Sequence, residues 1–390
     1  MAAVLNHAGS IEKITFFMEE CKKMGLKVLG PDINESQNGF AVNQKGEIRF
    51  GFSGLKGVGE NAIENIIEER TKHGPFSSIF DLAKRVVQRS VNRKSLESLI
   101  YAGAFDCFKE FTRPQYFYQA PGDVQALDKI IKFGNVYQAQ TTNSMHTLFG
   151  DMQMPDIQPP KLLPCEPWPL VMQLDYEKEV TGMYMSGHPL DNFKFEMQHY
   201  NITPLAEYND FKAAVNTYPN PARQFRVAGL VVDAQHRLTK TGKNFGIVTI
   251  EDYSGKSEFM LWSEDYVKYT NYLEKGLIVL VEGGFKQRYN TDQYEFRLSK
   301  IHLLETVKTT LTKQVVLDVQ PQFINEDFVN FIDANLKSNP GKTTLKLNIT
   351  DTRNNYKVGM YSLGAGFTMN DEMAVFLAGN KDVEVSVVTG

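Results

Sequence analysis

Apolar residues recur at three- and four-residue spacing through much of the first half of the chain, which is the period of an amphipathic helix. The first such series contains Ile14, Phe17 and Cys21, and Gly25 stands at its expected C-terminal end. The same pattern predicts helices over 9–27, 60–72, two segments within 77–108, 123–138, 170–186 and 190–214. Residues 40–52 alternate instead and predict a short hairpin. The first half is therefore expected to be mainly helical.

The pattern changes to alternation in the second half. Between residues 224 and 305, five alternating segments predict five strands, and residues 263–273 predict a helix between the third and the fourth. This order is typical of an OB-fold, a small closed β-barrel. Residues 313–390 mix further strands with helices near 325–337 and 369–378, and predict a small α/β domain.

The composition limits the number of domains and the class of protein, but it does not indicate a function. The chain has 390 residues and a formal net charge of −4, so it is long enough for about two to four domains and has no overall excess of cations. Cys21, Cys107 and Cys165 lie far apart and lack CxxC spacing, which predicts neither a disulfide framework nor a zinc site. No apolar run reaches the roughly 18 residues of a membrane span, and the N-terminus lacks signal-peptide features. These features favour a cytoplasmic protein without a metal centre.

The stretch GLKGVGENAIENI (54–66) places three glycines before a predicted helix. Its order, G-x-x-G-x-G, differs from the dinucleotide-binding G-x-G-x-x-G, and the motif lacks the G-K-[ST] of a nucleotide P-loop. The spacing fits a helix–hairpin–helix, in which two glycines allow a tight turn close to a DNA strand. Amides at the start of the second helix would then bind backbone phosphates independently of base sequence. The predicted contact residues are Lys56, Gly57, Val58 and Gly59.

The alternative for this motif is a tight turn between packed helices, with no ligand. Acidic residues on the second helix weaken the case for strong DNA binding; they are Glu60, Glu64, Glu68 and Glu69. Gly57 separates the two interpretations. If it serves DNA contact, Gly57→Val should weaken duplex binding and leave the melting temperature nearly unchanged, whereas a large loss of stability would indicate a packing turn.

An OB-fold binds single strands on the face of its second and third strands, and through the loops between strands 1–2 and 4–5. In this chain both loops are basic and the second is also aromatic, which suits phosphate contact and base stacking. The predicted contact residues are Arg237, Lys240, Lys243, Lys286, Arg288 and Tyr289. Tyr294 and Phe296 follow the second loop, and the alternative for them is burial in the barrel core.

Several long segments together resemble the alpha subunit of bacterial DNA polymerase III, a family C replicative polymerase. The segments are 12–36, 48–70, 74–86, 91–106, 177–191 and the alternating stretch that begins at residue 226. The resemblance implies the C-terminal third of such a DNA-directed DNA polymerase, a nucleotidyltransferase. The palm, with its metal-binding aspartates and Mg²⁺, would lie upstream, so this segment is expected to be non-catalytic and without a cofactor. His188, in SGHPLD, has no triad or metal spacing and is expected to mark a turn.

The same resemblance implies two protein partners. Family members carry a sliding-clamp-binding peptide, Gln-x-x-(Leu/Met)-Phe-Gly, in a tether after the hairpin module. Met145, Leu148 and Phe149 stand at those places here, with Met145 where the family has Gln. The alternative is that these apolar residues pack back on the domain. Residues 313–390 fall where the family has the domain that binds the tau subunit of the clamp loader.

The overall expectation is a multi-domain α+β protein that holds duplex and single-stranded DNA and docks to the clamp and its loader. The expected parts are 1–47 (end of a fingers-like region), 48–108 (helix–hairpin–helix module), 109–165 (linker with the clamp-binding peptide), 166–215 (helical connector), 216–307 (OB-fold β-barrel) and 308–390 (tau-binding-like domain). A free-standing nucleic-acid-binding protein of repair or recombination, built from the same modules, is the alternative. Palm motifs upstream in the same reading frame would favour the polymerase.

Overall fold

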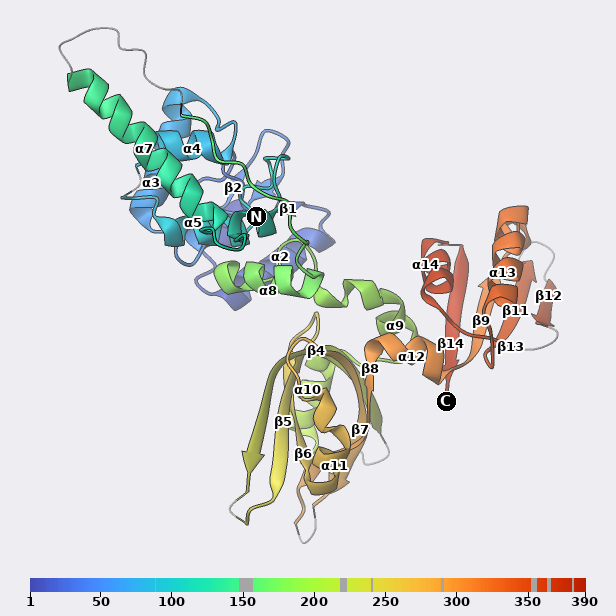
Figure 1. Cartoon of the computed structure of the whole chain (residues 1–390). Coiled ribbons are helices and arrows are strands. Elements are labelled where there is room, and N and C mark those ends of the chain that lie inside the picture. Colours follow the sequence, from blue (N-terminus) through green and yellow to red (C-terminus); the bar gives the residue numbers. More distant parts are fainter. Residues whose placement is uncertain are drawn as a thin grey trace. The chain divides into compact units, whose positions relative to one another are not determined.

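The structure is a computed structural model that describes residues 1–87, 89–146, 157–217, 223–239, 241–288, 291–351, 356–362, 366–380 and 382–390. The chain divides into two compact units, Met1–His188 and Pro189–Gly390. The first unit is mainly helical and the second contains two larger sheets, which agrees with the change of pattern along the sequence (Figure 1). The finer six-part division remains a prediction.

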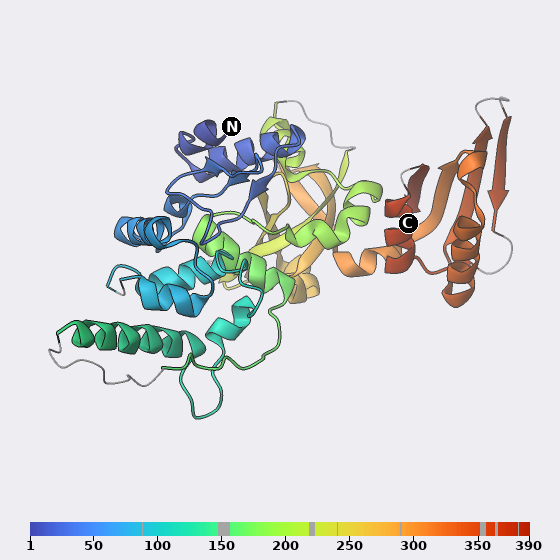
Figure 2. The same ribbon diagram turned by 90° about the horizontal axis from the view of Figure 1, so that it is seen from above.

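The first unit consists of helices and a small sheet near its N-terminus. The helices are α1 (Ala2–Asn6), α2 (Ile11–Lys23), α3 (Glu60–His73), α4 (Ile79–Arg85), α5 (Arg93–Tyr101), α6 (Arg113–Phe117), α7 (Ala126–His146) and α8 (Leu170–Thr181), with a 3₁₀ turn, η1, at Phe52–Gly54. The sheet has the order β1 (Val28–Leu29), β3 (Ile48–Arg49), β2 (Ala41–Val42). Its antiparallel β2–β3 pair confirms the predicted hairpin. Helix α7 continues well beyond the predicted end at residue 138 and packs along α4 (Figure 2).

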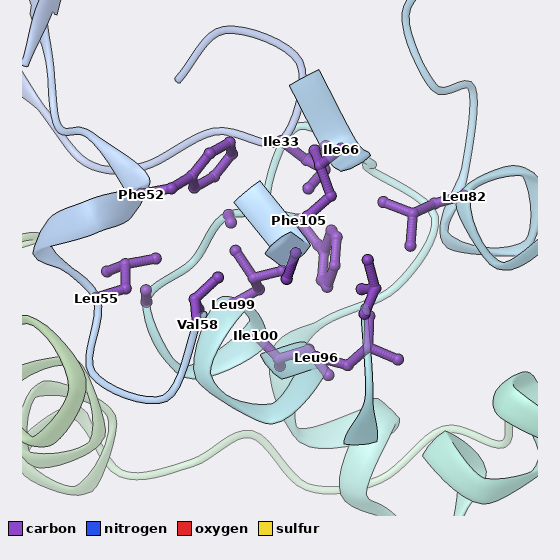
Figure 3. Close-up of a cluster of buried hydrophobic side chains, with 14 of the residues drawn as sticks. Ile33, Phe52, Leu55, Val58, Ile66, Leu82, Leu96, Leu99, Ile100 and Phe105 are labelled. Carbon is purple, nitrogen blue, oxygen red and sulfur yellow. The ribbon is translucent and has the colours of Figure 1, made fainter. Parts of the chain in front are cut away.

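One hydrophobic core joins the glycine-containing turn to the helices around it. Phe52, Leu55 and Val58 precede α3 and pack in the same cluster as Leu99 and Ile100 of α5 (Figure 3). All five side chains are buried, and Val58, at 8 %, is the most exposed. Burying such side chains stabilises a fold by about 1.5–3 kcal/mol each. The inner side of the turn is therefore fixed by packing.

The region predicted as a linker, residues 109–165, is folded over its first part. Tyr116 of α6 and Leu127 and Ile130 of α7 are fully or almost fully buried in the core of the first unit. The predicted helix over 123–138 overlaps the first part of α7. Helices α6 and α7 therefore share one hydrophobic core with the glycine-containing turn before α3.

A buried ion network holds α8 against α6. Nη1 of Arg113 donates a hydrogen bond to Oε1 of Glu177 at 2.6 Å, and Glu177 is fully buried. Glu177 also accepts hydrogen bonds from the amides of Met185 and Ser186 and from the Ser186 hydroxyl, while Nε of Arg113 donates to Asp106 at 3.0 Å. Burial alone would lower the pKa of Arg113, but the hydrogen bonds to Asp106 and Glu177 outweigh it and raise that pKa. This network is named the Arg113–Glu177 clasp.

The second unit begins with a helical connector, followed by a five-stranded sheet. The connector contains η2 (Pro189–Phe193), α9 (Lys194–His199) and α10 (Leu205–Ala214). The sheet contains β4 (Gln224–Leu238), β5 (Asn244–Glu251), β6 (Lys256–Trp262), β7 (Ile278–Gln287) and β8 (Tyr294–Leu303), with α11 (Ser263–Tyr269) and η3 (Thr270–Tyr272) between β6 and β7. Its order is β6-β5-β4-β7-β8 with antiparallel neighbours. The five strands and the position of the helix confirm the predicted OB-like order.

This sheet is not a closed barrel, so the predicted closure was wrong. Within the described residues, no backbone pairing joins β6 to β8. The ring of Tyr208, from α10, lies 5.3 Å from that of Phe259 on β6 and 5.5 Å from that of Phe296 on β8, between ring centroids. Phe259 and Phe296 are themselves 5.3 Å apart. The two edges therefore meet through aromatic packing in place of a hydrogen-bonded ladder, and Phe296 and Tyr294 both pack against the core.

The C-terminal domain is a four-stranded sheet with helices packed against its apolar face. Its elements are α12 (Leu304–Leu311), β9 (Thr312–Val319), η4 (Pro321–Phe323), α13 (Glu326–Ser338), β10 (Pro340–Gly341), β11 (Thr344–Asp351), β12 (Tyr356–Tyr361), β13 (Gly366–Phe367), α14 (Asp371–Gly379) and β14 (Val383–Thr389). The strand order is β12-β11-β9-β14, and only the β9–β11 pair among these is parallel. Phe195 and Tyr200 of the connector share a core with Leu317 and Met373 of this domain.

Candidate nucleic-acid interface

The turn before α3 presents main chain at the surface. Gly57 has a φ of +88°, a conformation that residues with a side chain rarely adopt, and Gly59 is the N-cap of α3 without a side-chain cap. The amide of Lys56 donates a hydrogen bond to the carbonyl of Val180 at 2.8 Å. The C-terminal end of α8 therefore holds the outer side of the turn, and the Arg113–Glu177 clasp holds α8.

This turn forms one wall of an open groove of about 600 Å³. The opposite wall is the start of α5 and the segment before it, which contribute Arg89, Asn92 and Lys94. Arg89 and Lys94 are exposed, and neither forms an ion pair within the part of the chain that the structure describes. The groove therefore combines the main chain at a helix start with two unpaired cations, an arrangement that suits a phosphate backbone. It is named the hairpin groove.

The structure places the predicted hairpin residues at or beside this groove, in different ways. Lys56, Gly57 and Gly59 are exposed, whereas the side chain of Val58 lies in the core and leaves only its main chain available. Sequence reasoning missed the opposite wall. The sequence feature that could have indicated this wall is the basic run RSVNRK (89–94). It leads into α5, whose N-cap is Asn92.

Gly57 also has a packing role, which corrects the expectation that valine would leave stability unchanged. A Cβ atom at Gly57 would lie 2.5 Å from Oγ of Ser98, and the positive φ adds strain. At Gly59, in contrast, nothing lies within 4 Å of an added Cβ, and φ is −78°. Substitution of Gly59 therefore tests the DNA contact, whereas substitution of Gly57 tests packing as well.

The five-stranded sheet of the second unit carries a stacked aromatic pair on its outward face. Phe245 of β5 and Trp262 of β6 are cross-strand partners, with ring centroids 4.7 Å apart and planes inclined by 15°. Trp262 is 41 % exposed. Arg237 of β4 is the partner of Phe245 on its other side, so the three side chains lie on one face of the sheet. Lys243, also exposed, lies two residues before Phe245 in the turn that enters β5.

A flat, half-exposed ring beside cations is a surface on which a nucleobase can stack while its phosphate contacts a charge. The next cross-strand pair on the same face, Ile247 and Met260, extends the apolar surface, and Met260 is 49 % exposed. The surface formed by the rings of Phe245 and Trp262 is named the Phe245–Trp262 platform.

The predicted loop residues divide into three groups. Arg237 and Lys243 lie beside the platform. Lys286 and Arg288 are exposed at the end of β7, on a different strand pair. Lys240 and Tyr289 lie outside the described residues. Phe245 and Trp262 were not predicted as contact residues. The alternation that predicts the strands also tells which side chains face outward, and these two occupy outward positions of the second and third strands.

The other predicted features are placed as follows. Met145 lies near the end of α7, and Leu148 and Phe149 lie outside the described residues. The ring of His188 packs edge-on against the ring of Tyr184, and the two ring centroids are 5.2 Å apart. Among the described residues, no group of three or more His, Cys, Asp or Glu side chains could hold a metal ion. None of the described helices is both long and apolar enough to cross a bilayer.

Three family models match successive parts of the chain. A helix-hairpin-helix motif matches residues 25–116, an OB-fold nucleic acid binding domain matches 225–304, and the C-terminal domain of the DNA polymerase III alpha subunit matches 315–388. The DNA polymerase III alpha subunit of Escherichia coli K12 is 36% identical over 288 residues, which cover 73% of this chain and 23% of the relative. The chain belongs to the DNA polymerase III alpha family. This assignment confirms the resemblance predicted from the sequence.

Other alpha subunits match over a larger part of the chain. That of Pasteurella multocida is 30% identical over 345 residues, covering 88% of this chain and 28% of the relative. That of Pseudomonas aeruginosa is 29% identical over 365 residues, covering 90% and 30%. The chain thus spans less than a third of the length of these alpha subunits. Its matched modules include two that bind nucleic acid in general, the hairpin and the OB-fold.

Proposed function

We propose that this chain is the DNA-binding and partner-docking C-terminal part of a replicative DNA polymerase III alpha subunit. The observation that carries the proposal is the Phe245–Trp262 platform, a stacked aromatic pair on an OB-like sheet in which Phe245 is half-buried and Trp262 is exposed. An exposed apolar surface of this kind marks an interaction site. Its neighbours Arg237 and Lys243 supply charge for the phosphates of a strand whose bases stack on the rings. In this role the platform holds single-stranded template.

The hairpin groove takes the second role, contact with duplex DNA. Duplex DNA hides its base faces and presents phosphates, so amides and cations suffice for binding that does not depend on sequence. Lys56, Arg89 and Lys94 are the side chains assigned to this contact. In this proposal, DNA synthesis and the Mg²⁺ that it needs are assigned to the rest of the parent protein. The part formed by this chain is non-catalytic.

Docking to the sliding clamp and to the tau subunit of its loader completes the proposal. The clamp peptide is assigned to residues 145–150, on the strength of the apolar pair Leu148 and Phe149 in a polar stretch. The loader contact is assigned to the C-terminal domain, supported by the family match over 315–388. Pull-down of the clamp by the full chain should be lost when Leu148 and Phe149 are both changed to Ala.

Binding of a fluorescent oligo-dT to the full chain tests the platform. Phe245→Ala with Trp262→Ala should weaken binding by roughly tenfold or more, because stacking contributes about 1–3 kcal/mol per base. The matched control is Val267→Ala, at an exposed apolar side chain on α11 next to the same sheet. Fluorescence anisotropy gives both dissociation constants. Equal affinity of the double variant and the control would refute the assignment.

A further inference from the structure

The two edges of the C-terminal sheet differ in how they are covered. Strand β14 is packed against α9. The side chain of Arg226 also donates hydrogen bonds to Thr389, the last residue of that strand, and to the neighbouring Gly390 carbonyl. Strand β12 forms the opposite edge and pairs only with β11 among the described strands (Figure 1). An uncovered edge is a template for another strand.

Strand β12 also exposes apolar side chains at alternate positions. Tyr356, Val358 and Met360 are 69 %, 52 % and 51 % exposed. Val358 and Met360 pair with Ile349 and Leu347 of β11, and cross-strand partners share a face, so all of them lie on the face that forms the core. The helices bury this face over β9 and β11, and it continues uncovered onto β12. Natural edge strands usually place charges at such positions, which discourages pairing.

The main chain of β12 has a defined outward register. The amide of Ser362 donates to the carbonyl of Leu345 at 2.9 Å, so this pair is hydrogen-bonded across the ladder. Hydrogen-bonded and non-hydrogen-bonded pairs alternate in an antiparallel ladder. The amides and carbonyls of Lys357, Gly359 and Tyr361 therefore face away from β11, toward the free edge.

Charge on the polar face of this edge indicates what kind of strand fits. Lys357 is exposed, and its Nζ lies 3.8 Å from Asp318, too far for a hydrogen bond. Lys346 of β11 lies on the same face, with Nζ 5.4 Å from the centre of the Tyr361 ring. A strand added beside β12 would place every second side chain near these lysines and the others near Val358 and Met360.

We propose that β12 is a docking edge for an extended segment of a protein partner, in which apolar residues alternate with Asp or Glu. The segment adds a fifth strand, hydrogen-bonds with the outward main chain of Lys357, Gly359 and Tyr361, and buries the apolar side chains of β12. This inference rests on the docking role proposed for the C-terminal domain, and it names the surface and the chemistry of the partner. Carboxylates on the outer face of the segment pair with Lys357 and Lys346.

Gly359 offers a sharp test, because its amide faces the free edge. Gly359→Pro removes that donor without removing a hydrogen bond to β11, and proline is tolerated on edge strands. Gly359→Ala is the matched control, since an added Cβ would meet its nearest neighbour, Oδ1 of Asn348, at an ordinary 3.6 Å. The probe is a fluorescent peptide of alternating Val and Glu, titrated against the full chain. Wild type and Gly359→Ala should bind equally, and Gly359→Pro about tenfold more weakly.

The outcomes separate this inference from the proposed function. No binding of the peptide by wild type, or equal binding by Gly359→Pro, would overturn the docking edge. A concentration-dependent dimer that Gly359→Pro abolishes would assign the edge to a second copy of the chain and would overturn it too. Retention of the peptide without retention of the tau subunit would refute the proposed loader contact and leave the docking edge standing.

Discussion

The hairpin groove and the Phe245–Trp262 platform are both exposed and basic, but they offer DNA different chemistry. The groove combines main chain at a helix start with Arg89 and Lys94, and none of the described residues that line it is aromatic. The platform places its cations beside two stacked rings. Phosphates are common to single and double strands, whereas only a single strand exposes base faces. The rings, and not the charge, therefore distinguish the two sites.

The largest expected effect separates the two units. Arg113→Met leaves Glu177 buried without its charged partner, and breaking a buried ion pair costs about 3–5 kcal/mol. Calorimetry should show a lower melting temperature for the first unit, with loss of duplex binding, while binding of oligo-dT is retained. Arg93→Gln is the control, because the Arg93 ion pairs are largely exposed. Equal melting of the two variants would contradict a stabilising role for the clasp.

The next effect separates packing from DNA contact within the hairpin groove. Gly57→Ala should destabilise the first unit by about 1–3 kcal/mol, because an L-residue is strained at its φ and its Cβ would meet Ser98. Gly59→Ala should lower the stability less than Gly57→Ala, because nothing lies within 4 Å of its added Cβ and the remaining cost is that of alanine at an N-cap. It should also weaken duplex binding, because a side chain at this position keeps a DNA strand from close approach to the main chain. Chemical denaturation and duplex anisotropy measure the two quantities. Equal stability of both variants would exclude the packing role of Gly57.

A smaller effect concerns the charge of the groove. Arg89→Gln with Lys94→Gln should reduce the slope of log affinity against log salt for duplex DNA by about 2, since each phosphate contact contributes about 0.9. The slope for oligo-dT should not change. Lys132→Gln is a surface lysine control on α7 in the same unit. If the duplex slope stays the same, the phosphates do not lie against this wall.

The smallest effect concerns the charge of the platform. Arg237→Gln with Lys243→Gln should reduce the salt slope for oligo-dT by about 1.4, at about 0.7 per contact on a single strand. Affinity at high salt should then depend mainly on Phe245 and Trp262. A changed duplex slope in this variant would remove the distinction between the two sites.

The sequence predicted element types well because periodicity is local. The series around Ile14, the alternation of β4 to β8 and the glycine spacing before α3 all depend on residues close together in the chain. The open barrel could not be predicted, since it depends on Tyr208, distant in sequence from Phe259 and Phe296, filling the gap between two edges. Hairpin residues were found by motif, whereas Arg89 and Lys94 become part of the groove only when α3 and α5 pack together.

The Arg113–Glu177 clasp sets the size of a workable fragment. The matched helix-hairpin-helix motif ends at residue 116, but the buried carboxylate that pairs with Arg113 and the carbonyl that accepts from the Lys56 amide come from residues 177 and 180. A protein cut at the motif boundary would expose the apolar surface that α7 and α8 now cover, and would be prone to aggregate. The matched motif therefore ends well before the unit that can fold by itself. A fragment expressed to study the helix–hairpin–helix module should extend to about residue 188.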